Sequence, residues 1–330
     1  MQELEQFRKR VEGRRKKPTS LANRLTDINC FERWCEEEGI ESPGDIGVNE
    51  IEDYLAYLGR EDYSGAVVNS RWWTLKIFFG DLVKRGEIEE NPLKDFDKRP
   101  YSDLFNGSKK AEYVDARGGI FALQEEGVHE LAENVPKPTL RNKLVVLLSY
   151  HTGVRRQELA DMKLKNVDRN KREILVYSKK KDSSFTKDTT DPWRSVWYGP
   201  SLDPLMDRWI EVERKGYSTA DSPYLFTTYK SERLSEDQIG EIVRKAAENA
   251  GIQEVMYVDL KGHERNLITH HTLRHSFARA CMTPDEAGNR IDVKRLAELM
   301  GHEDSSMTAE KYLHFAEDDI KQARELYGPR

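Results

Sequence analysis

The sequence HTLRHSFA at residues 271–278 sets a histidine and an arginine, His271 and Arg274, three positions apart. In a helix this spacing places both side chains on one face, so that a proton carrier lies beside a guanidinium group. Upstream, TGVR at residues 152–155 puts Arg155 directly after a glycine turn, where the first amides of a new helix also attract an anion. Two planar, permanently charged guanidinium groups suit one phosphodiester. The two segments together predict a phosphate clamp.

Two further segments follow in order. LMGH at residues 299–302 supplies a second histidine, His302, and KYLH at residues 311–314 supplies Tyr312. A free phenol has a pKa of about 10, so it attacks near neutral pH only if cations stabilise the phenolate or a base takes the proton. Attack on phosphorus adds negative charge, which preorganised positive groups stabilise. The four segments therefore indicate DNA strand transfer.

Each segment also has a plainer interpretation when it is taken alone. Arg155 would be a surface arginine, His271 a residue at a helix start, and Tyr312 a packing residue of an amphipathic helix. Glu158, on the same helical face as Arg155, is expected to hold that arginine in place. Only the combination favours chemistry.

The histidines around residue 271 raise a second possibility, a metal site. They form a loose cluster: His263, His270, His271 and His275. Their spacing fits no common ligand pattern, and no cysteine or carboxylate set accompanies them. The three cysteines lack C-x-x-C spacing, so neither a disulfide framework nor a zinc site is indicated. We expect no metal and no other cofactor.

The composition predicts a soluble protein of two domains. The chain has 330 residues, 34% of them charged and 37% hydrophobic, and single domains usually run about 100–200 residues. The longest apolar run, residues 144–148, is far shorter than the roughly 20 residues of a membrane-spanning helix. The basic N-terminus lacks the apolar core of a signal peptide. We expect a cytoplasmic protein without a membrane partner.

The charge distribution gives mixed evidence on whether the chain binds nucleic acid. The net charge of −6 argues mildly against nucleic acid, since polyanion binders usually carry a basic face. Local clusters matter more: RKRVEGRRKK at residues 8–17 is strongly basic, and Lys179, Lys180 and Lys181 are consecutive. Either cluster is equally consistent with an ordinary solvated surface.

Hydrophobic periodicity predicts a mainly α fold. Helices are expected from residue 20 to Gly39, from Asn49 (with Glu52 at capping-box spacing) to Gly59, and around 68–86. Residues 96–117 have no clean period and are expected to be a linker. Beyond it, helices are expected at 122–134, 139–151, 155–162, 235–250, 272–282, 291–300 and 305–326, with strand-like runs at 173–178 and 194–198. The two runs predict a small hairpin on a helical domain.

The four segments with their apolar flanks resemble the motifs of tyrosine recombinases, the Xer-like and phage-integrase family. They are T-G-x-R-x-x-E-L at 152–159, H-x-L-R-H-S-F-A at 271–278, L-M-G-H at 299–302 and the tyrosine at 312. The resemblance extends over most of the chain and includes Asn91-Pro92 at the end of the first helical region. It implies a basic N-terminal tail (1–19), a helical, SAM-like core-binding domain (20–95), a linker (96–117) and a mostly α catalytic domain with a small antiparallel sheet (118–330).

The resemblance also implies a role for each residue. Tyr312 would attack the scissile phosphate and form a 3′-phosphotyrosyl bond, which releases a 5′-hydroxyl. Arg155 and Arg274 would hold the non-bridging oxygens, with His271 beside them as proton acceptor or hydrogen-bond donor and His302 bound to the phosphate. A further lysine would be the general acid; Lys179 fits its position best, with Lys180 and Lys181 as close alternatives. The His302–Tyr312 spacing is one residue longer than the commonest in the family.

The implied function is site-specific recombination of double-stranded DNA by a homotetramer on two DNA sites, without a small-molecule substrate. Three alternatives stay open on the sequence. A type IB topoisomerase-like nicking and closing enzyme would use the same chemistry as a monomer. A DNA-binding regulator would keep the fold without catalysis. A metal-dependent nuclease would use the histidine cluster.

Overall fold

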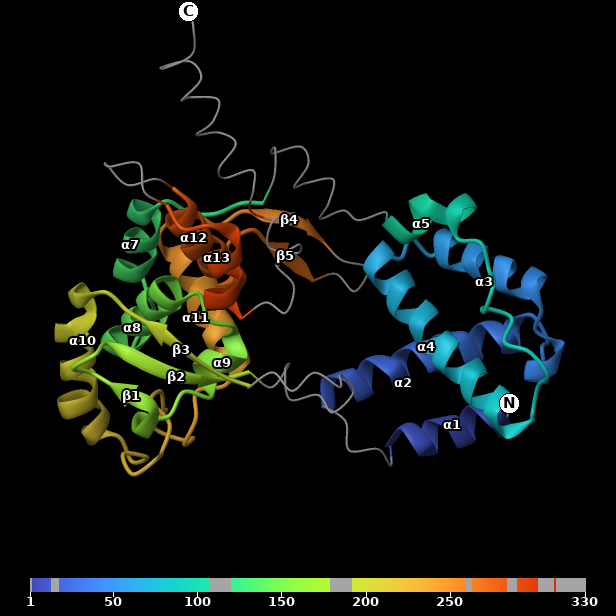
Figure 1. The fold of residues 1–330 in the computed structure, drawn as a ribbon, viewed down its shortest axis with the longest axis horizontal. Coiled ribbons are helices and arrows are strands. Elements are labelled where there is room, and N and C mark those ends of the chain that lie inside the picture. Colours follow the sequence, from blue (N-terminus) through green and yellow to red (C-terminus); the bar gives the residue numbers. More distant parts are fainter. Residues whose placement is uncertain are drawn as a thin grey trace, which may run out of the picture. The chain divides into compact units, whose positions relative to one another are not determined.

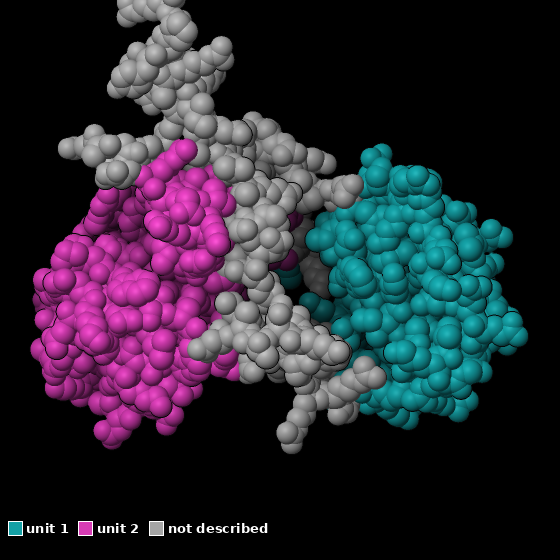
Figure 2. All heavy atoms as spheres, in the orientation of Figure 1, with its two compact units in different colours: residues 1–113, 259–263 teal, residues 114–258, 264–330 magenta. Residues whose placement is uncertain are grey.

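The computed structural model describes residues 2–12, 18–106, 120–178, 192–258, 263–283, 290–301 and Tyr312. The chain divides into two units, residues 1–113 with 259–263 and residues 114–258 with 264–330 (Figure 2). Within the described ranges, no helix is both long and apolar enough to cross a bilayer. The expected helix at 305–326 lies outside the described residues except for Tyr312.

The first unit is built from helices (Figure 1). They are α1 (Gln2–Glu12), α2 (Pro18–Glu37), α3 (Val48–Arg60), α4 (Gly65–Arg85) and α5 (Ser102–Asn106), with short 3-10 turns at Pro43–Asp45 and Arg99–Tyr101. Their apolar stripes bury an aromatic core that includes Phe31, Trp34, Tyr54, Phe78 and Phe79. As expected, α4 ends at Gly86, whose φ of 70° closes the helix in the left-handed region.

Two parts of the predicted domain plan are corrected. Residues 2–12 form a helix rather than a tail, because Leu4, Phe7 and Val11 lie on one face and are buried in the core of the unit. Their basic neighbours hid this stripe, and Arg10 now binds Asp81 of α4 at 2.8 Å. The first half of the expected linker also folds, since Phe105 is buried in the same core.

The start of the second expected helix is also corrected. The sequence favoured Asn49 as the cap, with Glu52 closing the capping box. In the structure α3 begins at Val48 after Gly47, and the side chain of Glu50 accepts a hydrogen bond from the Gly47 amide at 2.8 Å. The same motif is used two residues earlier, because Gly47 adopts the extended backbone of a cap without needing a side chain.

The second unit surrounds α8. Its helices are α7 (Glu125–Glu133), α8 (Thr139–Thr152), α9 (Arg156–Ala160), α10 (Asp203–Arg208), α11 (Glu236–Asn249), α12 (His270–Met282) and α13 (Val293–Met300). Short 3-10 turns are at Leu164–Asn166, Pro200–Leu202 and Arg214–Gly216, and a π-helical segment is at Trp209–Glu213. The apolar run at 144–148 is buried throughout, because α8 packs against α7, α11, α12 and strand β3.

Two small antiparallel sheets complete this unit. The first has the order β1 (Val167–Asp168), β2 (Glu173–Tyr177) and β3 (Trp193–Trp197). In its ladder Glu173 pairs with Trp197 at one end, and Val176 pairs with Arg194 near the other. The second sheet pairs β4 (Val255–Val258) with β5 (Glu264–Asn266), and the sequence patterns did not predict it.

Candidate active site

Arg155 stands where two helices meet. α8 ends at Gly153, whose φ of 58° lets the chain turn, and Arg155 is the extended residue that begins α9. Glu158 accepts hydrogen bonds from the Arg155 amide at 2.8 Å and from its Nη1 at 3.0 Å. The expectation that Glu158 holds Arg155 is confirmed. The other end of the guanidinium, Nη2, donates to the carbonyl of Gly301 at 2.9 Å.

Arg274 is a buried guanidinium that joins the same two segments. Its side chain is 1% exposed, and it donates from Nη1 to the carbonyl of Gly153 and from Nη2 to that of Met300 at 2.6 Å. Arg155 and Arg274 thus both connect the turn after α8 to the end of α13. The two arginines that the sequence paired as a clamp do lie together.

Arg194 is a third arginine in this cluster, and the sequence patterns did not single it out. From β3 it donates to both carboxylate oxygens of Glu158, at 3.0 and 2.9 Å, and from Nε to the carbonyl of Leu299 at 3.2 Å. The strand pattern carried a signal, because Arg194 lies on the same face as the buried Val196, where an apolar residue is usual. An arginine on the buried face of a strand is expected to pair with a carboxylate, because charged side chains are rarely buried unpaired.

The charges of this cluster do not balance. Among the side chains that the structure describes in this cluster, the guanidinium groups of Arg155, Arg194 and Arg274 bring three positive charges against one negative charge on Glu158, which leaves two. Burial alone would raise the pKa of Glu158, but the charge and hydrogen bonds of Arg194, followed by the charge of Arg155, lower it to about 2. Burial, and then the charge of Arg155, lower the pKa of Arg274 to about 9. A partly buried site with surplus positive charge favours an anion.

Tyr312 lies beside this cluster with its phenol turned inward. Its side chain is 1% exposed and packs against Ala278, Met282, Leu296 and Met300. Its hydroxyl is 2.8 Å from Nδ1 of His275, the residue that follows Arg274 on α12. Burial raises the pKa of the phenol to about 12, although the charges of Arg274 and Arg155 act in the opposite direction. The phenol is therefore within electrostatic reach of both arginines.

The histidines of α12 have different surroundings. His271 is exposed, and its ring lies 4.3 Å from that of His275 in an edge-to-face arrangement. His270 is buried, with Nε2 3.1 Å from the hydroxyl of Ser149. Burial, then the charge of Arg156, lower the pKa of His270 to about 3. Among the residues that the structure describes, no three His, Cys, Asp or Glu side chains are grouped as a metal site would require.

Several predicted site residues cannot be placed. Lys179, Lys180, Lys181 and His302 lie outside the described residues. The structure describes the residues that directly precede two of them in the sequence. Ser178 precedes Lys179, and Gly301 precedes His302. Gly301 lies within the arginine cluster, because its carbonyl accepts from Arg155.

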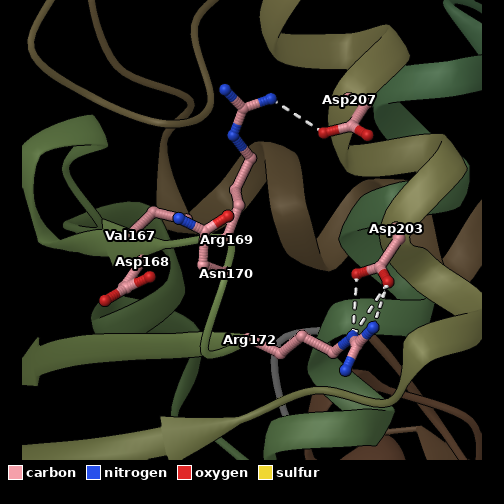
Figure 3. A pocket seen from close by; sticks show the side chains of 7 residues that line it. All are labelled: Val167, Asp168, Arg169, Asn170, Arg172, Asp203 and Asp207. Atoms are coloured by element: carbon pink, nitrogen blue, oxygen red, sulfur yellow. Dashed lines mark hydrogen bonds and ion pairs between the residues drawn. The ribbon is translucent and has the colours of Figure 1, made fainter.

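A pocket elsewhere in this unit is a poor candidate (Figure 3). It is lined by Val167, Asp168, Arg169, Asn170, Arg172, Asp203 and Asp207. Arg169 is bound to Asp207 and Arg172 to Asp203, each at 2.7 Å, so these arginines are already neutralised. The lining residues lie around the turn between β1 and β2, at the Glu173 end of the ladder and away from Arg194.

Comparison with known proteins decides the family. Residues 122–318 match the phage integrase family, and residues 4–89 match the phage integrase N-terminal SAM-like domain. The chain belongs to the phage integrase family. Arg155, His271, Arg274 and Tyr312 all fall within the first match, and the family resemblance seen in the sequence is confirmed.

Relatives of this phage integrase family member are tyrosine recombinases. Tyrosine recombinase XerC of Lactobacillus leichmannii is 26% identical over 303 residues, covering 90% of this chain and 88% of that protein. Tyrosine recombinase XerA of Pyrococcus furiosus is 32% identical over 210 residues, which cover 62% of this chain and 60% of that protein.

Solved structures of integrases share the fold. The Tn1549 transposon integrase in complex with transposon right end DNA has a TM-score of 0.70 at 18% identity and covers 99% of both chains. A lambda integrase dimer bound to a COC′ core site has a TM-score of 0.64 at 18% identity over 94% of both. The predicted fold class, mainly α with a small antiparallel sheet, is confirmed.

Proposed function

We propose that this chain is a site-specific DNA recombinase that cleaves and rejoins DNA through a 3′-phosphotyrosyl intermediate on Tyr312. One observation carries the proposal. Tyr312 is hydrogen-bonded to the residue next to Arg274 and belongs to the same buried cluster as Met300, whose carbonyl Arg274 binds. A nucleophile and a surplus of positive charge therefore occupy the same place, as phosphoryl transfer requires.

Arg155 and Arg274 bind the non-bridging oxygens of the scissile phosphate in this proposal. Both are held by backbone carbonyls, so their orientation is set before DNA arrives. Such preorganisation stabilises charge that develops in the transition state without reorganisation at that moment. His271 is exposed and acts on the phosphate, while His302 adds a hydrogen bond to it. Lys179, with Lys180 and Lys181 as alternatives, protonates the leaving 5′-oxygen.

Double-stranded DNA is the substrate and partner. The integrase structures that share this fold are described as DNA complexes, and the relatives are named recombinases. The first, helical unit and the second unit, which carries the candidate active site, both contribute to DNA binding. Exchange of two duplexes requires four strand cleavages, so four protomers act on two DNA sites. No metal or nucleotide is consumed, since the covalent bond conserves the phosphodiester energy.

The test is covalent trapping on nicked suicide duplexes that carry candidate target sites. The wild-type protein should form a covalent protein–DNA adduct on the 3′ side of the break, and Tyr312→Phe should form none. Tyr229→Phe is the matched control, because that phenol is 62% exposed and lies in another part of the unit. An adduct in Tyr312→Phe would overturn the nucleophile assignment. Failure of the wild-type protein on every site would favour the non-catalytic regulator.

A Holliday-junction assay separates recombination from simple nicking and closing. The recombinase should resolve a synthetic junction into recombinant duplexes. Relaxation of supercoiled DNA without any recombinant product would instead identify a topoisomerase-like enzyme.

A further inference from the structure

His275 contacts the reactive atom of the proposed nucleophile. Its Nδ1 lies 2.8 Å from the hydroxyl oxygen of Tyr312, and the two ring centroids are 5.6 Å apart. His275 follows His271 by one helical turn on α12, so both imidazoles point to the same side of the helix. The sequence pattern predicted proton handling by His271, whereas the structure places His275 beside the phenol.

The surroundings of Tyr312 make a protein proton acceptor necessary. The side chain is 1% exposed within an apolar cluster, so bulk water has little access to the hydroxyl. A phenol that attacks phosphorus must lose its proton, and a group at hydrogen-bond distance is the natural acceptor.

The hydrogen bond at the phenol places His275 where it can accept the proton. Arg155 and Arg274 are cations that carry no acceptor site. Cys281 packs against the same cluster, but burial raises the pKa of its thiol to about 11, so it keeps its own proton. An imidazole, in contrast, accepts a proton readily near neutral pH.

We propose that His275 is a catalytic residue that holds the Tyr312 phenol and accepts its proton during attack on the scissile phosphate. The inference rests on the proposed function. The proton moves from the phenol to Nδ1, which requires the tautomer that carries hydrogen on Nε2. The phenol oxygen bonds to phosphorus, the bond to the 5′-oxygen breaks, and the general-acid lysine protonates that oxygen. On rejoining, the lysine takes the proton of the 5′-hydroxyl as that oxygen bonds to phosphorus, the bond to Tyr312 breaks, and His275 returns a proton to the phenolate.

The proposal divides the work between two histidines one turn apart. His271 is exposed and acts on the phosphate, whereas His275 is 8% exposed and acts on the nucleophile. The edge-to-face contact between their rings, 4.3 Å apart, fixes the orientation of the buried imidazole. Each histidine should therefore fail in a different way when it is replaced.

The test replaces the acceptor and, separately, changes the acidity of the phenol. His275→Asn keeps a hydrogen-bonding group near the position of Nδ1 but cannot take a proton, and His275→Gln is a second variant should the first fold poorly. Single-turnover cleavage of a suicide duplex is measured with tyrosine and with trifluorotyrosine at position 312. The fluorinated phenol is more acidic and needs less help from a base.

The expected result is a loss of about 100-fold or more for His275→Asn with tyrosine, within the usual range for general-base catalysis. With trifluorotyrosine the loss should shrink by about tenfold, since part of the base's task is removed. If His275 only supported the structure, His275→Asn would lower the cleavage rate by the same factor with both phenols. His270→Asn is the matched control. His270 lies on the same helix as His275, but its hydrogen bond is to Ser149 of α8.

The possible results distinguish a failure of the His275 assignment from a failure of the proposed recombinase function. Unchanged cleavage in His275→Asn, or an equal loss with both phenols, overturns the role of His275 while adduct formation at Tyr312 stands. Absence of any adduct in the wild-type protein overturns the recombinase function itself. For His270→Asn we expect lower thermal stability and the same ratio of rates with the two phenols as in the wild type.

Discussion

Arg194 and Glu158 form a two-point ion pair, with Nη1 and Nη2 of the arginine 3.0 and 2.9 Å from the two carboxylate oxygens. Both side chains are shielded, at 11% and 3% exposure. Because Glu158 also binds the amide and guanidinium of Arg155, the pair connects strand β3 to the phosphate clamp. We therefore propose that Arg194 is a positioning residue that acts through Glu158 and Arg155.

Replacing Arg194 should impair cleavage more than it impairs DNA binding. We expect Arg194→Lys to lower the single-turnover cleavage rate by about 100-fold, because a lysine cannot bind both carboxylate oxygens and a small misplacement of Arg155 has an effect of that size. Arg172→Lys is the control, since that arginine pairs with Asp203 at the far end of the sheet. Its rate should match the wild type.

A neutral substrate distinguishes positioning from general destabilisation. With a methylphosphonate at the scissile position, the charge that Arg155 neutralises is absent, so the defect of Arg194→Lys should become smaller. An equal defect on both substrates would mean that Arg194 only supports the fold.

Glu158 should make stability depend on pH. Its pKa is about 2 in the folded protein against an ordinary 4.5, so its ion pairs stabilise the fold fully above about 4.5 and are lost as the pH falls towards 2. Glu158→Gln should cost roughly 3–5 kcal/mol at pH 7, since it breaks a buried pair. Urea unfolding should show this difference narrowing below about pH 4.5. A difference that stays constant with pH would contradict the assignment; Glu130→Gln, at an exposed position, is the control.

Gly153 should tolerate no side chain. Its φ of 58° disfavours other residues, and a Cβ there would overlap the ring of Phe277 on α12. Gly251 has a φ of 71° with nothing within 4 Å of a Cβ, so Gly251→Ala isolates the backbone cost. We expect Gly153→Ala to lose roughly 1–3 kcal/mol more than this control, because the overlap must be relieved. Equal losses in thermal unfolding would show that Phe277 moves aside freely.

Chelation should leave cleavage unchanged. His270 and His275 lie within hydrogen-bond distance of the hydroxyl groups of Ser149 and Tyr312, so these ring nitrogens already have partners. The yield of covalent adduct should be the same with EDTA or with added Mg²⁺. Loss of cleavage in EDTA, restored by a divalent cation, would instead favour the nuclease that uses the histidine cluster.

Local patterns in the sequence predicted many of the helices and one contact of the site. The stripe of α4 up to Gly86, the helix expected at 235–250 and the Arg155–Glu158 pair were all predicted. Each depends on residues within a few positions of one another, where helical geometry alone places the side chains. The order of the four segments also identified the family, because motifs of fixed residue types and short spacing can be recognised from the sequence alone.

Only the tertiary structure decided which distant groups meet. Arg194 reaches Glu158 across 36 residues, and His275 reaches Tyr312 across 37. Arg274 and Arg155 find their carbonyl partners across 121 and 146 residues. Helical or strand periodicity tells which face a residue lies on but not which face of another element it will meet. The sequence by itself therefore predicted the clamp and the nucleophile and identified the family, whereas packing decided which residues surround the clamp and which histidine contacts Tyr312.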